Sequence, residues 1–483
     1  MIRLRREFFL VLLVAAMHLG VGAYSASAQD QTQPPSEETP KPAGSSVPIP
    51  VINSGDQQDQ NGQSNLSPDA NPLTGVVTPT LGAPEIRHSY WVPGVQWSGV
   101  MQSNSYNQTA NSAWLMNNFL VANLSLLQSW SHSQLNINYS GGGFFSTDST
   151  QGNGTVQQLA ASQSFQWNRW QFQLLDEFSY LPQTSLGFGG GTGLGVPGIG
   201  GSLGPVIPGI GGGYVPNQSI YLAEGPRYSN ASVVQMTYMI SPRGSLTVSG
   251  SYGVLNFVDA GNVDDQMTTA TIGYNYLLSR EASVGLFYQF GAYHFSGQPD
   301  AYGSHSLNFA YGRKLTGRLA LQTYIGPLFT TSRISTNGDT VSHGVNVGAS
   351  LTLGFRNGNL TGNYNHGISG GSGILNGSTV DQMNFGLSHG LSRVWSGQIN
   401  VGYGHNTPIE GFGSVESQAY NTWNFGGGVS RPFGRNVSLA IAYNATITKN
   451  SLPGCTSGNC DENSTYNYVT INFQWHSRPF VLP

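Results

Sequence analysis

Residues 341–355 read Val-Ser-His-Gly-Val-Asn-Val-Gly-Ala-Ser-Leu-Thr-Leu-Gly-Phe, and this stretch decides the fold class. Its apolar residues and His343 alternate with serine, glycine, asparagine and threonine at a period of two. A helix cannot sort such residues onto separate faces, whereas a strand places every second side chain on the same side. The stretch therefore predicts one long strand with an apolar face and a small, polar face. The same alternation returns at residues 284–290, 438–444 and 469–475.

Short turn signals between such strands recur at a regular spacing. Neighbouring turn centres lie 36 to 41 residues apart, except for one interval of 73 residues that contains a glycine-rich insertion, residues 183–227. Gly, Asn and Pro in these turns supply the backbone geometry that tight hairpins need. Each repeat is thus predicted to be a strand hairpin, with longer and more varied connections at the opposite end. The predicted turn centres are His132, Arg169, Pro242, Arg280, Gly317, Asn357, Arg393 and Gly434.

Repeated hairpins with one apolar face predict a closed cylinder in a membrane. Lipid tolerates strands only when no edge is left unpaired. A propeller or an extracellular sandwich is the alternative, but there the small polar face would pack against another sheet. The predicted fold is all-β, an antiparallel up-and-down transmembrane β-barrel of 18 strands. Sixteen strands is the alternative count, because alternation is mixed near residues 93–102 and 116–127.

Composition agrees with a membrane barrel and excludes several other classes. Only 9% of the 483 residues are charged, against roughly 25% in ordinary soluble domains. The one long apolar run lies at the N-terminus, so a bundle of membrane helices is not expected. The net charge of -4 gives no reason to expect a nucleic-acid partner. Aromatic residues near strand ends are predicted to form girdles at the two bilayer interfaces: Tyr90, Trp91, Trp167, Trp170, Tyr180, Trp395, Phe433, Trp475 and Phe480.

The N-terminal part of the chain predicts export followed by a disordered tether. Arg3, Arg5 and Arg6 precede an apolar run, and Ala26-Ser27-Ala28 offers a cleavage site, so residues 1–28 are predicted to be a cleaved signal peptide. A membrane anchor is the alternative, but the run is short for one. Residues 29–88 are rich in Pro, Gln and Ser and are predicted to be a disordered periplasmic linker or partner-binding arm. The barrel is predicted over residues 89–483.

With these features the sequence resembles the porin-like outer-membrane β-barrel proteins of bacteria with two membranes. The leader, the hairpins with arginine in their short turns, residues 364–373 and a final strand rich in aromatics carry the resemblance. It implies an outer-membrane location, termini and short turns in the periplasm, and insertion by the barrel assembly machinery. Members of the family commonly end in Phe, whereas here Phe480 is followed by Val481, Leu482 and Pro483.

The residues predicted to line the lumen are mostly neutral, and they predict a channel of weak selectivity. Amides and hydroxyls exchange hydrogen bonds with uncharged polar solutes and provide no strong field for selecting ions. The alternative is a non-conducting structural or surface-interaction barrel, for example one linked to polysaccharide export or cell-envelope contacts. The predicted pore-lining residues are Gln289, Asn346, Ser350, Thr352, Asn384, Asn400, Asn424, Asn444, Asn472 and Gln474, with Asn363 and Asn365 on the same face.

Three local features add hypotheses. The insertion at 183–227 is interpreted as a constriction loop with Glu224 and Arg227 as its charges, or as a surface loop. Cys455 and Cys460 are predicted to form a local disulfide in an exported protein. Asp176 would face lipid in a regular strand, so a bulge or a membrane edge is expected there.

Catalysis, metal binding and a cofactor are not predicted. The histidines and acidic residues define no nucleophile, base and orienting group by their spacing. His343, His366 and His389 fall on predicted outward faces near strand ends, where interface positions are expected.

Overall fold

The computed structural model describes residues 89–104, 114–147, 153–181, 187–188, 220–221, 226–258, 264–279, 281–296, 301–334, 338–369, 378–408, 419–434, 436–451 and 463–482. The segments predicted as signal peptide and tether, most of the glycine-rich insertion, Glu224, Cys455 and Cys460 lie outside these ranges. Within them, no helix has the length and apolar character needed to span a membrane.

Antiparallel strands make up nearly the whole described chain. The barrel strands are β1 (Ser89–Asn104), β2 (Leu115–Ser129), β3 (Ser133–Ser146), β4 (Asn153–Trp167), β5 (Trp170–Leu181), β8 (Arg227–Met239), β9 (Gly244–Phe257), β10 (Asp265–Leu277), β11 (Ala282–Phe295), β12 (Ala301–Lys314), β13 (Leu319–Ile334), β14 (Gly338–Phe355), β15 (Gly358–Ser369), β16 (Ser378–Gly390), β17 (Ser396–Pro408), β18 (Ala419–Phe433), β19 (Val437–Ser451) and β20 (Asn463–His476). Two short strands of the insertion, β6 (Gly187–Phe188) and β7 (Ile220–Tyr221), pair only with each other.

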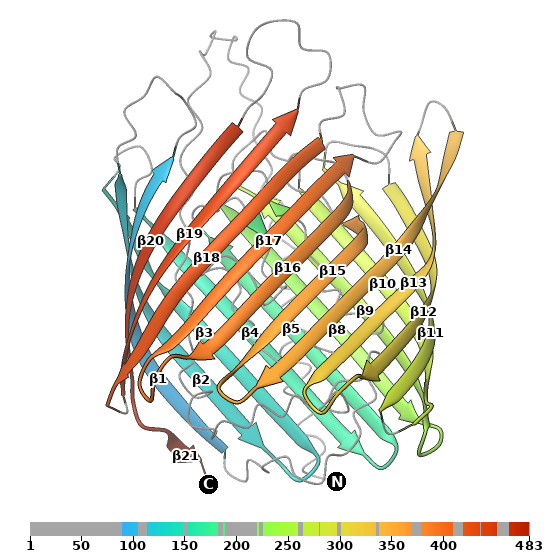
Figure 1. The fold of residues 1–483 in the computed structure, drawn as a ribbon, viewed down its shortest axis with the longest axis horizontal. Coiled ribbons are helices and arrows are strands. Elements are labelled where there is room, and N and C mark those ends of the chain that lie inside the picture. The colour runs from blue at the N-terminus through green and yellow to red at the C-terminus, as the bar shows by residue number, and fades with distance from the viewer. Residues whose placement is uncertain are drawn as a thin grey trace, which may run out of the picture. The chain divides into compact units, whose positions relative to one another are not determined.

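The barrel closes because the first strand pairs with both its neighbours. β1 pairs along its length with β2 on one edge and with β20 on the other. A short final strand, β21 (Phe480–Leu482), continues past the end of β20 along β1. Figure 1 shows the tilted strands with β21 at the edge of the barrel that carries the tight turns. The prediction of an 18-stranded antiparallel barrel is confirmed, and the two segments of mixed alternation are the strands β1 and β2.

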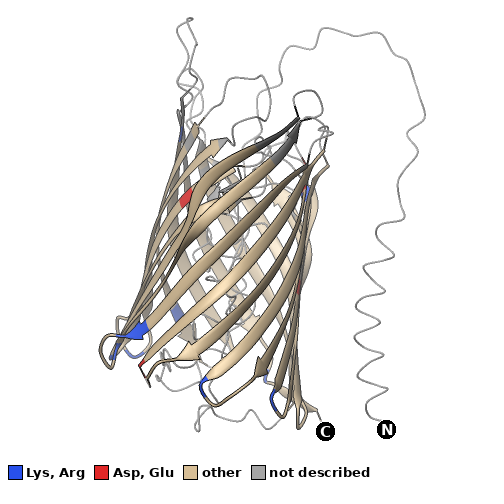
Figure 2. Cartoon of the chain, turned by 90° about the vertical axis from the view of Figure 1, so that its right-hand side faces the viewer, with Lys and Arg blue, Asp and Glu red and all other residues tan. Residues whose placement is uncertain are grey.

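Seven of the eight predicted turn centres lie within the described residues, and each joins consecutive strands at one edge of the barrel. The eighth, Arg280, lies outside the described residues. The turn between β4 and β5 has Asn168 with φ 55° and the turn after β18 has Gly434 with φ 72°. These are the two residue types that adopt left-handed backbone at least cost. Five arginines lie exposed in or beside these turns: Arg169, Arg243, Arg318, Arg356 and Arg393. Figure 2 shows blue residues at this edge of an otherwise mostly tan wall.

The register keeps like side chains on one face all the way around the barrel. Leu351 of β14 pairs with Leu321 of β13, and Ser350 pairs with Asn363 of β15. Side chains on the convex face of a closed sheet splay apart, whereas those on the concave face converge. Accordingly, large apolar side chains such as Ile325 and Ile399, each 57% exposed, lie on the outer face. The small polar set lies on the inner face.

Outward aromatic residues gather at the edge with the tight turns. Trp167, Trp170, Trp475 and Phe480 are all exposed there, and Trp91 stacks on Phe480 with ring centroids 4.8 Å apart. This arrangement is typical of an interfacial girdle. Tyr90 was predicted for the same girdle, and this prediction is wrong: it pairs with the buried Leu127 on the inner face, because it is one residue out of phase with Trp91.

The expected irregularity at Asp176 is absent. The ladder runs without a bulge from Ala161 of β4 through Asp176 to Ser232 of β8, near the middle of β5. Asp176 therefore occupies a regular outward position, and its neighbours accommodate the carboxylate. Ser232 Oγ donates to Asp176 Oδ1 at 2.7 Å and Asn230 Nδ2 donates at 3.2 Å, so the side chain is only 7% exposed.

The assignment of the two faces predicts that a new charge destabilises the protein more on the outer face than on the inner face. Ile325→Arg places a charge on the outer face and should lower the free energy of unfolding by about 2–4 kcal/mol in lipid vesicles. Asn346→Arg, on the inner face of the neighbouring strand, should cost less than about 1 kcal/mol because it adds no charge to the lipid face. Urea titration of each variant in vesicles, followed by tryptophan fluorescence, measures both. Equal losses in the two variants would contradict the assignment.

Candidate functional site on the inner wall

The residues predicted to line the lumen all occupy inward register positions. Asn424, for example, pairs with Gly402 on one side and Thr446 on the other, while its sequence neighbours Trp423 and Phe425 are exposed outward. None of the set is highly exposed: some are half-buried, and Asn384, Asn424, Asn444 and Gln474 are buried. The half-buried ones are Gln289, Asn346, Ser350, Thr352, Asn400 and Asn472, with Asn363 and Asn365 beside them.

Part of the hydrogen-bonding capacity of this wall is used between side chains of different strands. Thr446 Oγ1 donates to Asn424 Oδ1 at 2.6 Å, and Tyr324 Oη donates to Asn365 Oδ1 at 2.5 Å. Ser125 Oγ donates to Asn138 Oδ1 at 2.6 Å. Such cross-strand bonds hold the amides in fixed directions, so the inner wall is a positioned array of polar groups.

Another part of that capacity has no partner in the described chain. Both amide atoms of Asn406 and the hydroxyls of Thr422, Thr448 and Thr470 are buried without a hydrogen bond. Leaving a buried polar group unpaired costs about 1–3 kcal/mol. Water or a polar solute can supply the missing bonds. The inner wall is thus chemically suited to a hydrated space.

The inner wall also carries apolar and aromatic clusters, which the sequence analysis missed. Phe119 and Phe144 are each 1% exposed and lie 5.1 Å apart between ring centroids, in a cluster with Val100, Val121, Val156 and Tyr468. Across β11 and β12, Tyr293 stacks on Tyr302 at 4.4 Å, in a cluster with Met267, Phe295, Leu328 and Ile368. Phe287 and Tyr324 form a third cluster with Ala310. The wall is therefore a mosaic of polar and apolar patches.

The period of two along β11 is enough to predict which residues of these clusters face inward. Phe287 precedes Gln289 by two positions and Phe295 follows it by six, so all three residues share one face of β11. Once Gln289 is placed inward, Phe287 and Phe295 follow. The inner face of β11 therefore carries apolar rings beside its polar residues.

Of the two charges proposed for a constriction, Glu224 lies outside the described residues and Arg227 does not lie in a loop. Arg227 is the first residue of β8, where it lies buried on the barrel wall; it is not part of the insertion. Asp265 is the first residue of β10 and lies buried at an inward position, paired with Leu255 and Phe295. These two residues bring one charge of each sign to the end of the inner wall away from the tight turns.

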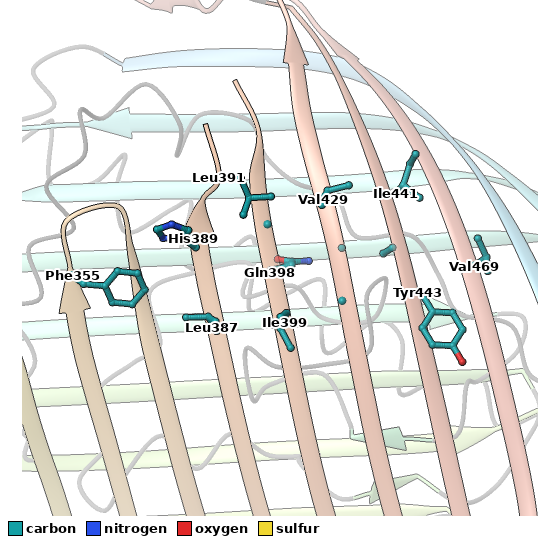
Figure 3. A pocket seen from close by; sticks show the side chains of 14 residues that line it. Phe355, Leu387, His389, Leu391, Gln398, Ile399, Val429, Ile441, Tyr443 and Val469 are labelled. Atoms are coloured by element: carbon teal, nitrogen blue, oxygen red, sulfur yellow. The ribbon is translucent and has the colours of Figure 1, made fainter. Parts of the chain in front are cut away.

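The outer wall has a shallow apolar hollow near the tight turns. It measures about 720 Å³, and Figure 3 shows Leu387, Ile399, Val429 and Ile441 around it. The hollow exists because outward positions of β17 and β18 are occupied by Gly397 and Gly427. Its lining is nearly all hydrocarbon, as expected of a lipid-facing surface. The histidines His343, His366 and His389 also lie at outward positions.

No protein-family model matches the sequence, and no curated protein matches it. Among solved structures, the chain aligns with Pseudomonas aeruginosa OpdK with vanillate at 8% identity and a TM-score of 0.42, covering 80% of this chain and 99% of that one. It aligns with Pseudomonas aeruginosa OpdQ at 8% identity and 0.41, covering 81% and 98%. Acinetobacter baumannii OccAB3 aligns at 8% identity and 0.40, covering 80% and 99%. At these TM-scores the likeness carries no argument about this chain.

The outward carboxylate of Asp176 yields a test of how the wall tolerates charge. Ser232→Ala removes its shorter hydrogen bond and should lower the free energy of unfolding by about 1.5–3 kcal/mol, the usual worth of a bond to a charged group. In an Asp176→Leu background the same Ser232→Ala change should cost less than about 1 kcal/mol, because no carboxylate remains to be satisfied. A double-mutant cycle by urea titration in vesicles measures the coupling, and additive losses would contradict this account.

Proposed function

We propose that this chain is an outer-membrane channel for the passive diffusion of small polar solutes, with weak selectivity. The observation that carries the proposal is the opposition of the two faces: exposed apolar side chains outside, and amides and hydroxyls with unused hydrogen-bonding capacity inside. A closed barrel of this strand number encloses a space wide enough for an aqueous path. Few inward charges stand on the described wall, which is why weak selectivity is proposed.

Localisation and orientation belong to the same proposal. The tight turns and the C-terminal β21 share one edge of the barrel, which we assign to the periplasm. The five exposed arginines in or beside the tight turns would face the phosphates of the inner leaflet. Export through a signal peptide cleaved after Ala28, a periplasmic tether over residues 29–88 and insertion by the barrel assembly machinery complete the assignment.

A non-conducting structural or surface-interaction barrel is the second candidate. The observation that favours it is the burial of the aromatic clusters on the inner wall, since an inner surface built for packing resembles a core. In either case the protein is assigned no chemical reaction, and the proposed partners are membrane lipid and small polar solutes.

Conductance separates the two candidates. The purified full chain in a planar bilayer should open in steps whose conductance rises in proportion to the bulk KCl concentration, because ions cross a weakly selective aqueous pore at their bulk density. A protein that inserts, as judged by protease protection in vesicles, and stays silent at all voltages would refute the channel and support the structural barrel.

New charges on the inner wall should change ion preference. Asn346→Asp or Asn444→Asp should raise the ratio of cation to anion permeability by roughly two- to threefold at low salt. A unit charge about 12 Å from the ion shifts its energy in water by ~0.3 kcal/mol, with opposite signs for cation and anion. Reversal potentials in a KCl gradient measure the ratio. His343→Asp, outward on the same strand as Asn346, is the control and should leave it unchanged; an equal shift in all three would contradict the inward assignment.

A further inference from the structure

A row of polar residues crosses the outer wall near the end of the barrel away from the tight turns. Each member pairs with the next across neighbouring strands from β15 to β19. The row lies three positions before the end of β15, where Ser369 is the last residue, and two to three positions from the corresponding ends of β16 to β19. We call it the polar row: His366, Asp381, His405, Asn421 and Lys449.

The first half of the row converges on a carboxylate. His366 Nδ1 lies 2.7 Å from Asp381 Oδ1, and Tyr364 Oη donates to the same oxygen at 2.9 Å. Asp381 Oδ1 thus accepts from both groups, and the second carboxylate oxygen has no hydrogen bond within the described chain. One acceptor at Asp381 is therefore available to a ligand.

The second half repeats this construction two strands further on. His405 Nδ1 lies 2.8 Å from Asn421 Oδ1, and Tyr403 Oη donates to that oxygen at 2.9 Å. Thr407 Oγ1 lies 3.1 Å from His405 Nε2. The Asn421 amide nitrogen has no hydrogen bond within the described residues, so it offers donors where Asp381 offers an acceptor.

The two halves enclose one pocket. Its volume is about 310 Å³, and it is lined by Tyr364, Asp381, Tyr403, His405 and Asn421, with Gln382 and Met383. A pocket with several convergent polar groups in an otherwise apolar wall is a candidate binding site. Its floor continues into aromatic surface, because the Tyr403 and Trp423 rings lie 4.5 Å apart between centroids.

The two outward carboxylates, Asp176 and Asp381, differ in their hydrogen-bond partners and in their exposure. Asp176 is closed in by Ser232 and Asn230 and needs no further partner from outside. The Asp381 side chain is 34% exposed and has no Lys or Arg ion partner within the described chain. A carboxylate open to hydrocarbon is costly, so Asp381 belongs at headgroup level, where a polar group can meet it.

We propose that the polar row and its pocket bind the phosphorylated sugar headgroup of a glycolipid in the outer leaflet. Sugar hydroxyls both donate and accept, matching the free oxygen of Asp381 and the free amide nitrogen of Asn421. The Tyr403 and Trp423 rings offer a surface for the apolar face of a sugar. The proposal rests on the outer-membrane orientation proposed above, but it does not depend on conduction, because the site lies on the other side of the wall.

The charge pattern of the row orients the headgroup. Asp381 repels phosphate, whereas Lys449, at the far end of the row, is exposed and has no ion pair with any described residue. Three strand spacings of about 4.8 Å separate the two backbones, roughly 14 Å. A phosphate at Lys449 and sugar hydroxyls at Asp381 span this length, whereas an ethanolamine phosphate is too short for it.

Native mass spectrometry of the full chain released from detergent tests the proposal. The probes are purified lipid A, a phosphorylated amino-sugar lipid, and phosphatidylglycerol. The protein should retain lipid A in preference to phosphatidylglycerol. Asp381→Asn with Asn421→Ala should lower lipid A retention about tenfold, since the first change weakens one hydrogen bond to the headgroup and the second removes another. Lys449→Gln should lower it as well.

Gln266→Ala is the matched control, because Gln266 is an exposed outward residue near the corresponding end of β10. Its lipid A retention should equal that of the original protein. Electrophoresis without boiling reports whether each variant folds. If the double variant fails to fold, Asn421→Asp replaces it. This substitution keeps the acceptor for His405 and Tyr403 but removes the free donor. Unchanged retention in the row variants, or phosphatidylglycerol retained as well as lipid A, would overturn the proposal.

Discussion

The structure depends on closure: every barrel strand has a hydrogen-bonded neighbour on both edges. β1 meets β2 on one side and β20 on the other, so the sheet has no free edge. In hydrocarbon an unpaired backbone group costs several kcal/mol, and closure is the only way for strands to avoid that cost. Once the backbone is satisfied, the outer face is free to be apolar, and alternation then turns the remaining residues toward the interior.

The outward carboxylates of Asp176 and Asp381 are each hydrogen-bonded by polar side chains nearby. Asp176 faces outward in mid-strand and is sealed by donors from β8, while Asp381 stands nearer a strand end with one oxygen unused. The first arrangement hides a carboxylate from lipid, and the second suits a level where headgroups begin. The inner wall is more varied than an amide lining, because rings such as Phe119 and Tyr302 pack between the polar patches. A solute would therefore meet both hydrogen-bonding and apolar surface.

Most of the architecture could be predicted from local chemistry. The period of two in residues 341–355 and the turn residues, such as Asn168 and Gly434, determine strand, register and hairpin without reference to distant contacts. Alternation is mixed in β1 and β2 for a physical reason: Val100, Phe119 and Val121 make their inner faces apolar too. The polar pocket on the outer wall was not predicted either. Its hydrogen-bonded side chains, such as His405 and Asn421, come together only through the register of separate hairpins.

The most direct test of the account is the alternation of environment along one strand in a bilayer. Single cysteines at residues 441 to 444 of β19, in a protein whose native cysteines are replaced by serine, would carry an environment-sensitive fluorophore. Labels at Ile441 and Tyr443 should be quenched by brominated lipid tails, and labels at Ala442 and Asn444 by aqueous iodide. Quenching of all four positions by iodide alone would show that no face of the strand contacts lipid, and the barrel would not be a membrane protein.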